Sequence, residues 1–295
     1  MPRRLLRTSC GRSKLPRVIV FCFGGRRANM ELQLPLVRRI LDEHPDVEYH
    51  LWNLARNAED AAYLNTIAGD RITVLNDFYG TQPWLAFNDI YRHYAAAEFA
   101  DRLFVKLDDD VVFIQTDRFS EFIEAIEDNR GCVVSAKVIN NGACTPIESD
   151  LHSQFATLGI PLLDVHLSGA YAEMCHHYLL NNWVGMINQP TRLIATEDWL
   201  SINLIGYDWR TGVRIADRLG TPTPELIAGR NFSAETLLGD EGMVNTLPRL
   251  VLEGFLAAHL YFGPQQMSDA LLADLRAGYA HAGQRYLEGE WAATA

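Results

Sequence analysis

The sequence predicts an α/β protein with a mostly parallel central sheet flanked by helices. Residues 18–23 form a β-branched and aromatic run that ends at Gly24-Gly25, which is typical of a strand buried on both faces. Strand and helix patterns then alternate over about 115 residues, as in doubly wound sheets. With 295 residues, 48% of them hydrophobic, the chain can bury a sizeable core.

The remaining elements follow from periodicity and from breaking residues. Helical spacing with a stop before Pro45 predicts a helix over residues 31–44. The pattern then predicts strands over 47–54, 72–75, 103–107, 111–114 and 131–138, and helices over 59–67, 87–99, 119–128 and 271–279. From Asn140 to Gly239 the periodicity blurs and Gly, Pro and Asn are frequent, so we expect a loop-rich carboxyl half.

Charge and cysteine usage exclude several classes of protein. The formal net charge is -11, although residues 1–17 hold six Arg and Lys and no acid. We therefore expect a flexible basic arm over 1–17 and a single domain over 18–295. An acidic domain is poorly suited to nucleic-acid phosphates. No apolar window reaches the roughly 18 residues of a membrane span, so we expect a cytoplasmic protein. Five cysteines without a C-x-x-C pair argue against a disulfide framework or a cysteine zinc site.

Three consecutive aspartates, Asp108, Asp109 and Asp110, separate two apolar runs that we expect in one sheet. Adjacent carboxylates repel each other and attract a hard divalent cation, and the first and third can point the same way in an extended chain. A solvated turn or a helix N-cap is the structural alternative. Because open α/β sheets bind ligands beyond the carboxyl ends of their strands, we expect a ligand site at these aspartates.

Residues 104–114, FVKLDDDVVFI, resemble the D-x-D segment of GT-A glycosyltransferases, which hold a nucleotide-sugar diphosphate through Mn²⁺ or Mg²⁺. Two later segments extend the resemblance over most of the chain. Gly239-Asp240-Glu241 resembles the family's acidic motif with the order of acids reversed, and His259 in AAHLYFGPQQ resembles the histidine that completes the metal shell. The resemblance implies a GT-A-like (Rossmann-like) domain, with a nucleotide-sugar-binding half over 18–138 and an acceptor-binding half over 139–295.

The resemblance also implies roles for individual residues. Asp108, Asp110 and His259 are the expected metal ligands, with Asp109 turned toward structure or the sugar. Mn²⁺ and Mg²⁺ take oxygen ligands, and Mn²⁺ also accepts an imidazole. The alternative for His259, which lies in an apolar segment, is a core histidine with its hydrogen bonds satisfied.

One carboxylate must also deprotonate the acceptor hydroxyl in an inverting transfer. Asp240 and Glu241 are the leading candidates, although they precede a helical stretch over 243–247, where a carboxylate also serves as a cap. Glu197-Asp198 is a competing pair, and spacing does not decide between the two.

Nucleotide contacts are expected in the amino half. Phe23, Gly24, Gly25 and Arg26 end the first strand, where small residues let a ligand approach the backbone and arginine reaches phosphate; a plain turn is the alternative. Asn53, at the end of the second predicted strand, is expected to read a uracil edge. His176, His177 and His281 are expected at the surface.

The resemblance therefore implies a metal-dependent glycosyltransferase, inverting, with a UDP-hexose donor and a hydroxyl acceptor. A protein, a small molecule or a glycan is the favoured acceptor, and a modified DNA base stays open. Relatives in the Golgi carry a membrane anchor, whereas this sequence has no apolar window long enough to be one. We therefore expect a bacterial or phage enzyme. One rival is a sugar-1-phosphate nucleotidyltransferase. The glycine-rich signature of those enzymes is not matched by Gly24-Gly25-Arg26-Arg27 of this chain. The other is a non-catalytic, cation-dependent sugar-binding module.

Overall fold

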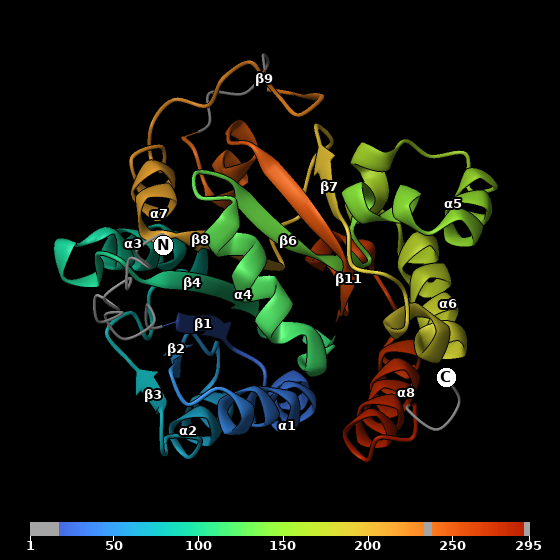
Figure 1. The fold of residues 1–295 in the computed structure, drawn as a ribbon, viewed down its shortest axis with the longest axis horizontal. Helices are drawn as coiled ribbons and strands as arrows, with labels where there is room; N and C mark the ends of the chain where they lie inside the picture. Colours follow the sequence, from blue (N-terminus) through green and yellow to red (C-terminus); the bar gives the residue numbers. More distant parts are fainter. Residues whose placement is uncertain (1–17, 233–237, 292–295) are drawn as a thin grey trace, which may run out of the picture.

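The structure, a computed structural model, describes residues 18–232 and 238–291. The predicted basic arm, residues 1–17, lies outside the described residues. In the described part of the chain a nine-stranded sheet has the order β3-β2-β1-β4-β8-β6-β11-β5, with β7 paired to β11. Helices flank this sheet (Figure 1). The predicted α/β class with a central sheet flanked by helices is confirmed.

The sheet is mixed, with four parallel and four antiparallel strand pairs. Its strands are β1 (Val18–Gly24), β2 (Val47–Asn53), β3 (Ile72–Leu75), β4 (Leu103–Asp108), β5 (Val111–Ile114), β6 (Val133–Ile139), β7 (Leu193–Thr196), β8 (Leu204–Asp208) and β11 (Arg249–His259). The pairings place β1, β2, β3, β4, β6 and β11 in one direction and β5, β7 and β8 in the other. A separate two-stranded hairpin is formed by β9 (Leu226–Ile227) and β10 (Arg230–Asn231).

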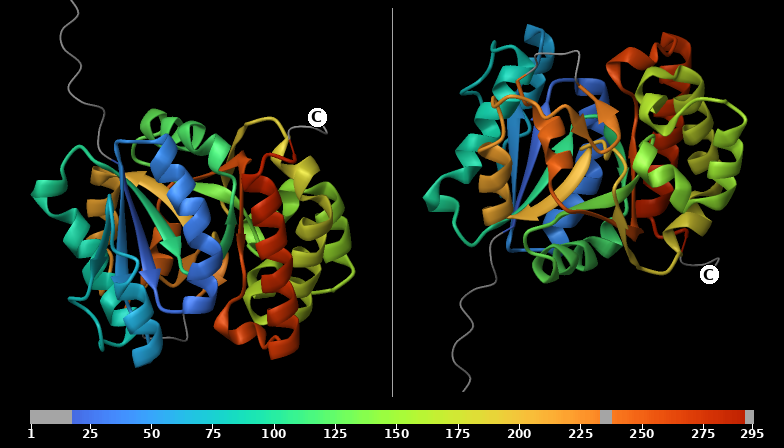
Figure 2. Two further views of the ribbon diagram at one scale, coloured as in Figure 1. Left: turned by 90° about the horizontal axis from the view of Figure 1, so that it is seen from below. Right: turned by 90° about the horizontal axis from the view of Figure 1, so that it is seen from above.

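The α-helices of the described residues are α1 (Arg27–Glu43), α2 (Ala58–Asn65), α3 (Pro83–Ala95), α4 (Phe119–Asp128), α5 (Ser149–Ala156), α6 (Gly169–Ile187), α7 (Trp209–Ala216) and α8 (Asp269–Leu287). Near opposite ends of the chain, α1 and α8 lie side by side (Figure 2), where Arg276 Nε donates to Asn29 Oδ1 at 3.0 Å. The 19-residue helix α6 lies in the interval expected to be loop-rich. Among residues 18–232 and 238–291, no helix has the length and apolar character needed to cross a membrane.

The acidic turn carries the chain from the middle of the sheet to its edge. β4 pairs with β1 and β8, whereas β5 pairs with β11, so the two apolar runs lie in one sheet without pairing to each other. Gln33 of α1 holds the turn, because its Nε2 donates to the carbonyl oxygens of Asp108 at 2.8 Å and Val111 at 3.0 Å. The register shift between Ala258 and His259 sets His259 beside Val111.

Candidate functional site

Most of the expected site residues of the amino half meet at the carboxyl ends of β1 and β4. Phe23 lies opposite Asp108 in the sheet, and Gly24 ends β1. The backbone N–H of Gly25 donates to Asp109 Oδ2 at 3.0 Å. The glycine turn and the acidic turn are therefore neighbours at the edge where α/β sheets bind ligands.

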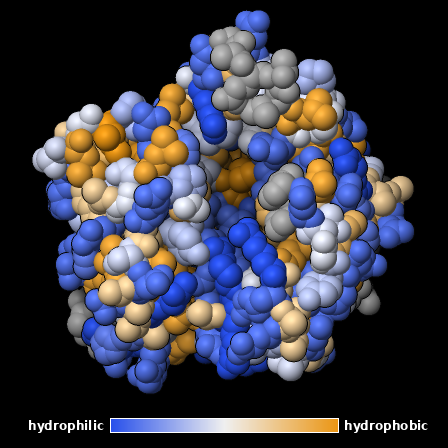
Figure 3. Space-filling view, turned by 180° about the vertical axis from the view of Figure 1, so that it is seen from behind, coloured by the Kyte–Doolittle hydropathy of each residue, from blue (hydrophilic) through white to orange (hydrophobic). Residues whose placement is uncertain are grey.

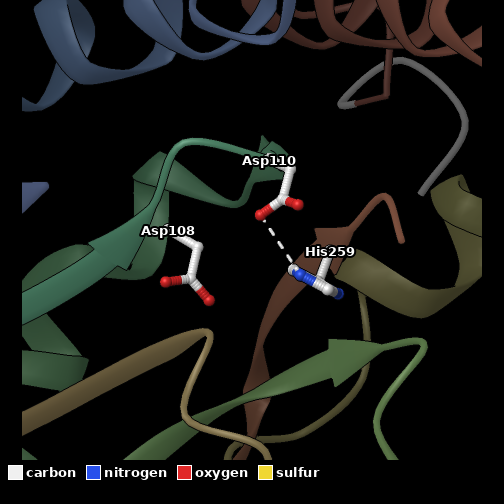
Figure 4. A group of neighbouring side chains, drawn as sticks. All are labelled: Asp108, Asp110 and His259. Carbon is white, nitrogen blue, oxygen red and sulfur yellow. Dashed lines mark ion pairs between the residues drawn. The ribbon is translucent and has the colours of Figure 1, made fainter. Parts of the chain in front are cut away.

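Asp108, Asp110 and His259 form a cluster with the composition of a metal site. Each offers a ligand atom, and these atoms lie within 4.8 Å of one another. The three side chains converge on one space, and His259 Nε2 lies 3.2 Å from Asp110 Oδ1 (Figure 4). Asp110 and His259 are 3% and 2% exposed, so water scarcely screens the pair.

A divalent cation fits this donor set. Asp110 Oδ1 is buried and accepts no hydrogen bond within the described residues, although buried carboxylate oxygens are normally satisfied. Lys106 Nζ lies 2.5 Å from Asp108 Oδ1, and Arg26 pairs with both Asp109 and Asp110. The carboxylates of the three aspartates carry three formal negative charges, and the side chains of Lys106 and Arg26 carry two positive charges. One formal negative charge therefore remains. Two carboxylates and an imidazole are a donor set that a divalent cation can use.

Asp109 is not one of the three clustered residues and is bound to Arg26, whose Nε donates to Asp109 Oδ2 at 3.1 Å. Burial raises the pKa of Asp109. Burial alone would also raise the pKa of Asp110, but the interactions with His259 and Arg26 outweigh it and hold that pKa well below its usual range. Asp110 is therefore ionised at neutral pH, as a cation ligand must be.

Asp240 and Glu241 have different surroundings. Asp240 is exposed, and its Oδ1 accepts from the N–H of Gly242 at 2.8 Å, so it caps the 3₁₀ helix η5 (Glu241–Thr246). The Glu241 side chain is only 14% exposed, and its Oε1 lies 3.4 Å from Lys106 Nζ. Burial raises the pKa of Glu241 to about 7 against the opposing charge of Lys106. A carboxylate with this pKa is suited to general-base chemistry near neutral pH.

A cavity of about 700 Å³ joins these groups, a volume typical of ligand sites. Its lining includes Phe23, Gly24, Gly25, Arg26, Asp108, Asp109, Asp110, Asp240, Glu241 and His259. Trp199, Arg230 and Phe232 line it as well. In the space-filling view, one face of the molecule is hollowed near its centre, with many hydrophilic residues around the hollow (Figure 3).

Two other groups of expected site residues lie apart from this cavity. Asn53 is buried, and its Nδ2 donates to Asn76 Oδ1 at 2.9 Å and to Ala61 O at 3.2 Å. Its amide is therefore engaged within its own chain, and Asn53 does not line the cavity. Glu197 and Asp198 are exposed and also lie outside the lining.

The surface prediction for His176 is wrong. His176 is fully buried, with Nδ1 at 2.6 Å from the Tyr279 hydroxyl and Nε2 at 2.6 Å from Leu260 O. Both ring nitrogens therefore have partners, which makes burial tolerable. His177 and His281 are exposed as expected.

Lys106 and Arg230 are site residues that the sequence analysis did not assign. Lys106 is 1% exposed and lies between Asp108 and Glu241. The sequence did contain a signal for Lys106, because a lysine inside an apolar strand is almost never buried without a charged partner. Arg230 lies on a hairpin outside the main sheet, and its place in the cavity follows only from the three-dimensional structure.

Comparison with protein-family models and with curated proteins found no match. Several solved structures are similar to this chain, and three of them are enzymes of known reaction. A 4-diphosphocytidyl-2C-methyl-D-erythritol synthase from Anaerococcus prevotii has 10% identity, covers 90% of this chain and 96% of its own, and has a TM-score of 0.43. The mannosyltransferase PcManGT from Pyrobaculum calidifontis, in complex with GDP-Man and Mn²⁺, has 13% identity, 94% and 73% coverage, and a TM-score of 0.42. The galactosyltransferase LgtC, in complex with donor and acceptor sugar analogs, has 12% identity, 90% and 95% coverage, and a TM-score of 0.41. Similarity at this level assigns neither a family nor an activity.

Proposed function

We propose that this protein is a divalent-cation-dependent glycosyltransferase that moves a sugar from a nucleotide-sugar to an acceptor hydroxyl. The observation that carries the proposal is the convergence of Asp108, Asp110 and His259 with the buried carboxylate of Glu241 in one cavity. A cation site and a carboxylate that can accept a proton are the two groups that this reaction requires.

Asp108, Asp110 and His259 would hold the cation, Mn²⁺ or Mg²⁺, and the imidazole favours Mn²⁺. When bound, the cation neutralises the diphosphate leaving group. Arg26 fixes Asp109 and Asp110 beside the glycine turn, where the N–H of Gly25 also donates to Asp109. We assign the donor to the half formed by residues 18–138 and the acceptor to residues 139–295, because these halves contribute the glycine turn and Glu241, respectively.

Glu241 would accept the proton of the acceptor hydroxyl. Its burial shields it from water, and Lys106 holds it near Asp108. Asp240, engaged as the cap of η5, would position Glu241 instead of reacting. A base separate from the cation ligands suits an inverting transfer. The resemblance of residues 104–114 to the D-x-D segment supports a UDP-hexose as the first donor to test.

Product identification tests this function. Purified protein is incubated with UDP-hexose or GDP-mannose and Mn²⁺, and the released nucleotide is identified. We expect a nucleoside diphosphate whose release stops on chelation and in Asp110→Asn, whereas Asp42→Asn, an exposed change on α1, behaves as wild type. Release of pyrophosphate from a nucleoside triphosphate and a sugar phosphate would identify a nucleotidyltransferase instead. Cation-dependent sugar binding without any cleavage would identify a binding module.

A further inference from the structure

Arg230 is presented to the cavity by a tight hairpin. It begins β10 and lies opposite Ile227 of β9, and Ala228 and Gly229 form the turn between the two strands. Both turn residues have positive φ, 47° for Ala228 and 80° for Gly229, as in the type I′ turns that join the strands of two-residue hairpins. A left-handed conformation is unfavourable for alanine. The turn therefore fixes the start of β10 at a conformational cost.

Two aromatic rings fix the guanidinium of Arg230. Its Cζ lies 5.1 Å from the ring centroid of Trp199 and 5.0 Å from that of Phe232, and the two rings are 6.0 Å apart. A guanidinium seated over rings keeps its N–H groups available at its edge. All three residues line the cavity.

Among the described residues, Arg230 differs from Arg26 in having no carboxylate partner. Arg26 pairs with Asp109 and Asp110, whereas no carboxylate within residues 18–232 and 238–291 forms an ion pair with Arg230. His166 also lines the cavity. Burial, together with the charge of Arg230, lowers the pKa of His166, so its imidazole is neutral at neutral pH. An arginine fixed on a cavity wall without an acid is suited to bind an anionic oxygen group.

The position of Trp199 places the guanidinium of Arg230 near Glu241, the proposed base. A Cβ added to Gly242 would lie 2.9 Å from Trp199 Cη2, so the indole packs directly against the residue that follows Glu241. The donor diphosphate, in contrast, belongs with Asp108, Asp110 and the glycine turn. The anion that reaches Arg230 is therefore more readily supplied by the acceptor than by the donor.

We propose that Arg230, Trp199 and Phe232 form an acceptor subsite that selects acceptors with an anionic group, a phosphate or a carboxylate. The guanidinium donates two hydrogen bonds to the anion, and the rings contact the apolar face of the acceptor. This inference rests on the proposed function, because the acceptor is defined by the transfer reaction.

Binding of three matched sugars tests the proposal without using turnover. Glucose, glucose 6-phosphate and glucuronate are titrated into the full chain by calorimetry in a chelating buffer near neutral pH. We expect both anionic sugars to bind at least about tenfold more tightly than glucose, as charge-assisted hydrogen bonds provide. Arg230→Gln should abolish this preference, and Arg230→Lys should retain part of it. Arg38→Gln, an exposed change on α1 with the same loss of charge, should keep it in full.

Equal binding of the three sugars to the wild type, or an unchanged preference in Arg230→Gln, would overturn the proposal. UDP titrated with Mn²⁺ distinguishes the two sources of the anion: its affinity should be unchanged in Arg230→Gln, and a loss equal to that of the anionic sugars would assign Arg230 to the donor. Cleavage of UDP-hexose is measured on the same preparations. Cleavage without the anionic preference refutes this inference alone, whereas preference without cleavage refutes the proposed function and, with it, the acceptor role.

Discussion

Replacing Glu241 with glutamine should stabilise the metal-free protein at alkaline pH. The pKa of Glu241 is raised to about 7 from an ordinary value of 4.5, so the folded state holds this proton more tightly than the unfolded state does. Below pH 4.5 both states are protonated and the substitution changes little. As pH rises toward 7 the unfolded state gains stability by ionising, and above 7 the folded state carries the full penalty. At ~1.36 kcal/mol for each pH unit, that penalty reaches about 3 kcal/mol.

Urea unfolding in the presence of a chelator measures this difference. At about pH 8 we expect Glu241→Gln to raise the free energy of unfolding by about 3 kcal/mol, and at about pH 5 by less than about 1 kcal/mol. Lys106 keeps Asp108 and the carbonyl of Ile202 as partners in the variant. Glu124→Gln, an exposed change on α4, is the matched control and should have no effect at either pH. A variant no more stable than wild type at pH 8, or an equal gain at both pH values, refutes the reasoning.

Three further substitutions test the supports of the site. Gln33→Met should lower the free energy of unfolding by about 2–4 kcal/mol in urea, because buried carbonyls of Asp108 and Val111 lose their donor; unchanged stability would contradict this. Asn53→Ala should lower the melting temperature while leaving UDP affinity unchanged in calorimetry; weaker UDP binding at unchanged stability would show that Asn53 contacts the base. His259→Ala should weaken Mn²⁺ affinity by roughly 10- to 100-fold, measured by titration, and an unchanged affinity would remove His259 from the cation site.

The apolar strands could be predicted from sequence because burial on both faces leaves a continuous hydrophobic run. β3 and α4 have the predicted bounds, and β1 ends at the predicted glycines. Helix α1 begins four residues before the predicted start, because Asn29 and Gln33 are polar yet buried against other elements. Helix α6 was missed although Ser168 caps it, with its Oγ accepting from Tyr171 N. Buried polar residues such as His176 interrupt the helical spacing of apolar residues on α6, so the pattern did not predict a helix there.

The candidate site was partly accessible from sequence. The acidic turn is a local pattern, and His259 was singled out by resemblance; the structure brings them together through the pairing of β5 with β11. Spacing alone could not separate Asp240 and Glu241 from Glu197 and Asp198, because the difference is one of burial and of access to the cavity. The role of Lys106 as a link between Asp108 and Glu241 also required the three-dimensional arrangement.

Binding of Mn²⁺ to the wild type and to Asp110→Asn, followed by electron paramagnetic resonance, tests the cation site most directly. We expect the wild type to bind one Mn²⁺ ion per chain and Asp110→Asn to lose this binding by roughly 100-fold or more, since an amide cannot replace the ligand charge. Asp42→Asn should bind as the wild type does. The same samples should cleave UDP-hexose only where Mn²⁺ binds. Undiminished Mn²⁺ binding by Asp110→Asn, or cleavage of UDP-hexose that persists under chelation, would contradict the assignment of Asp108, Asp110 and His259 as the centre of a cation-dependent transferase.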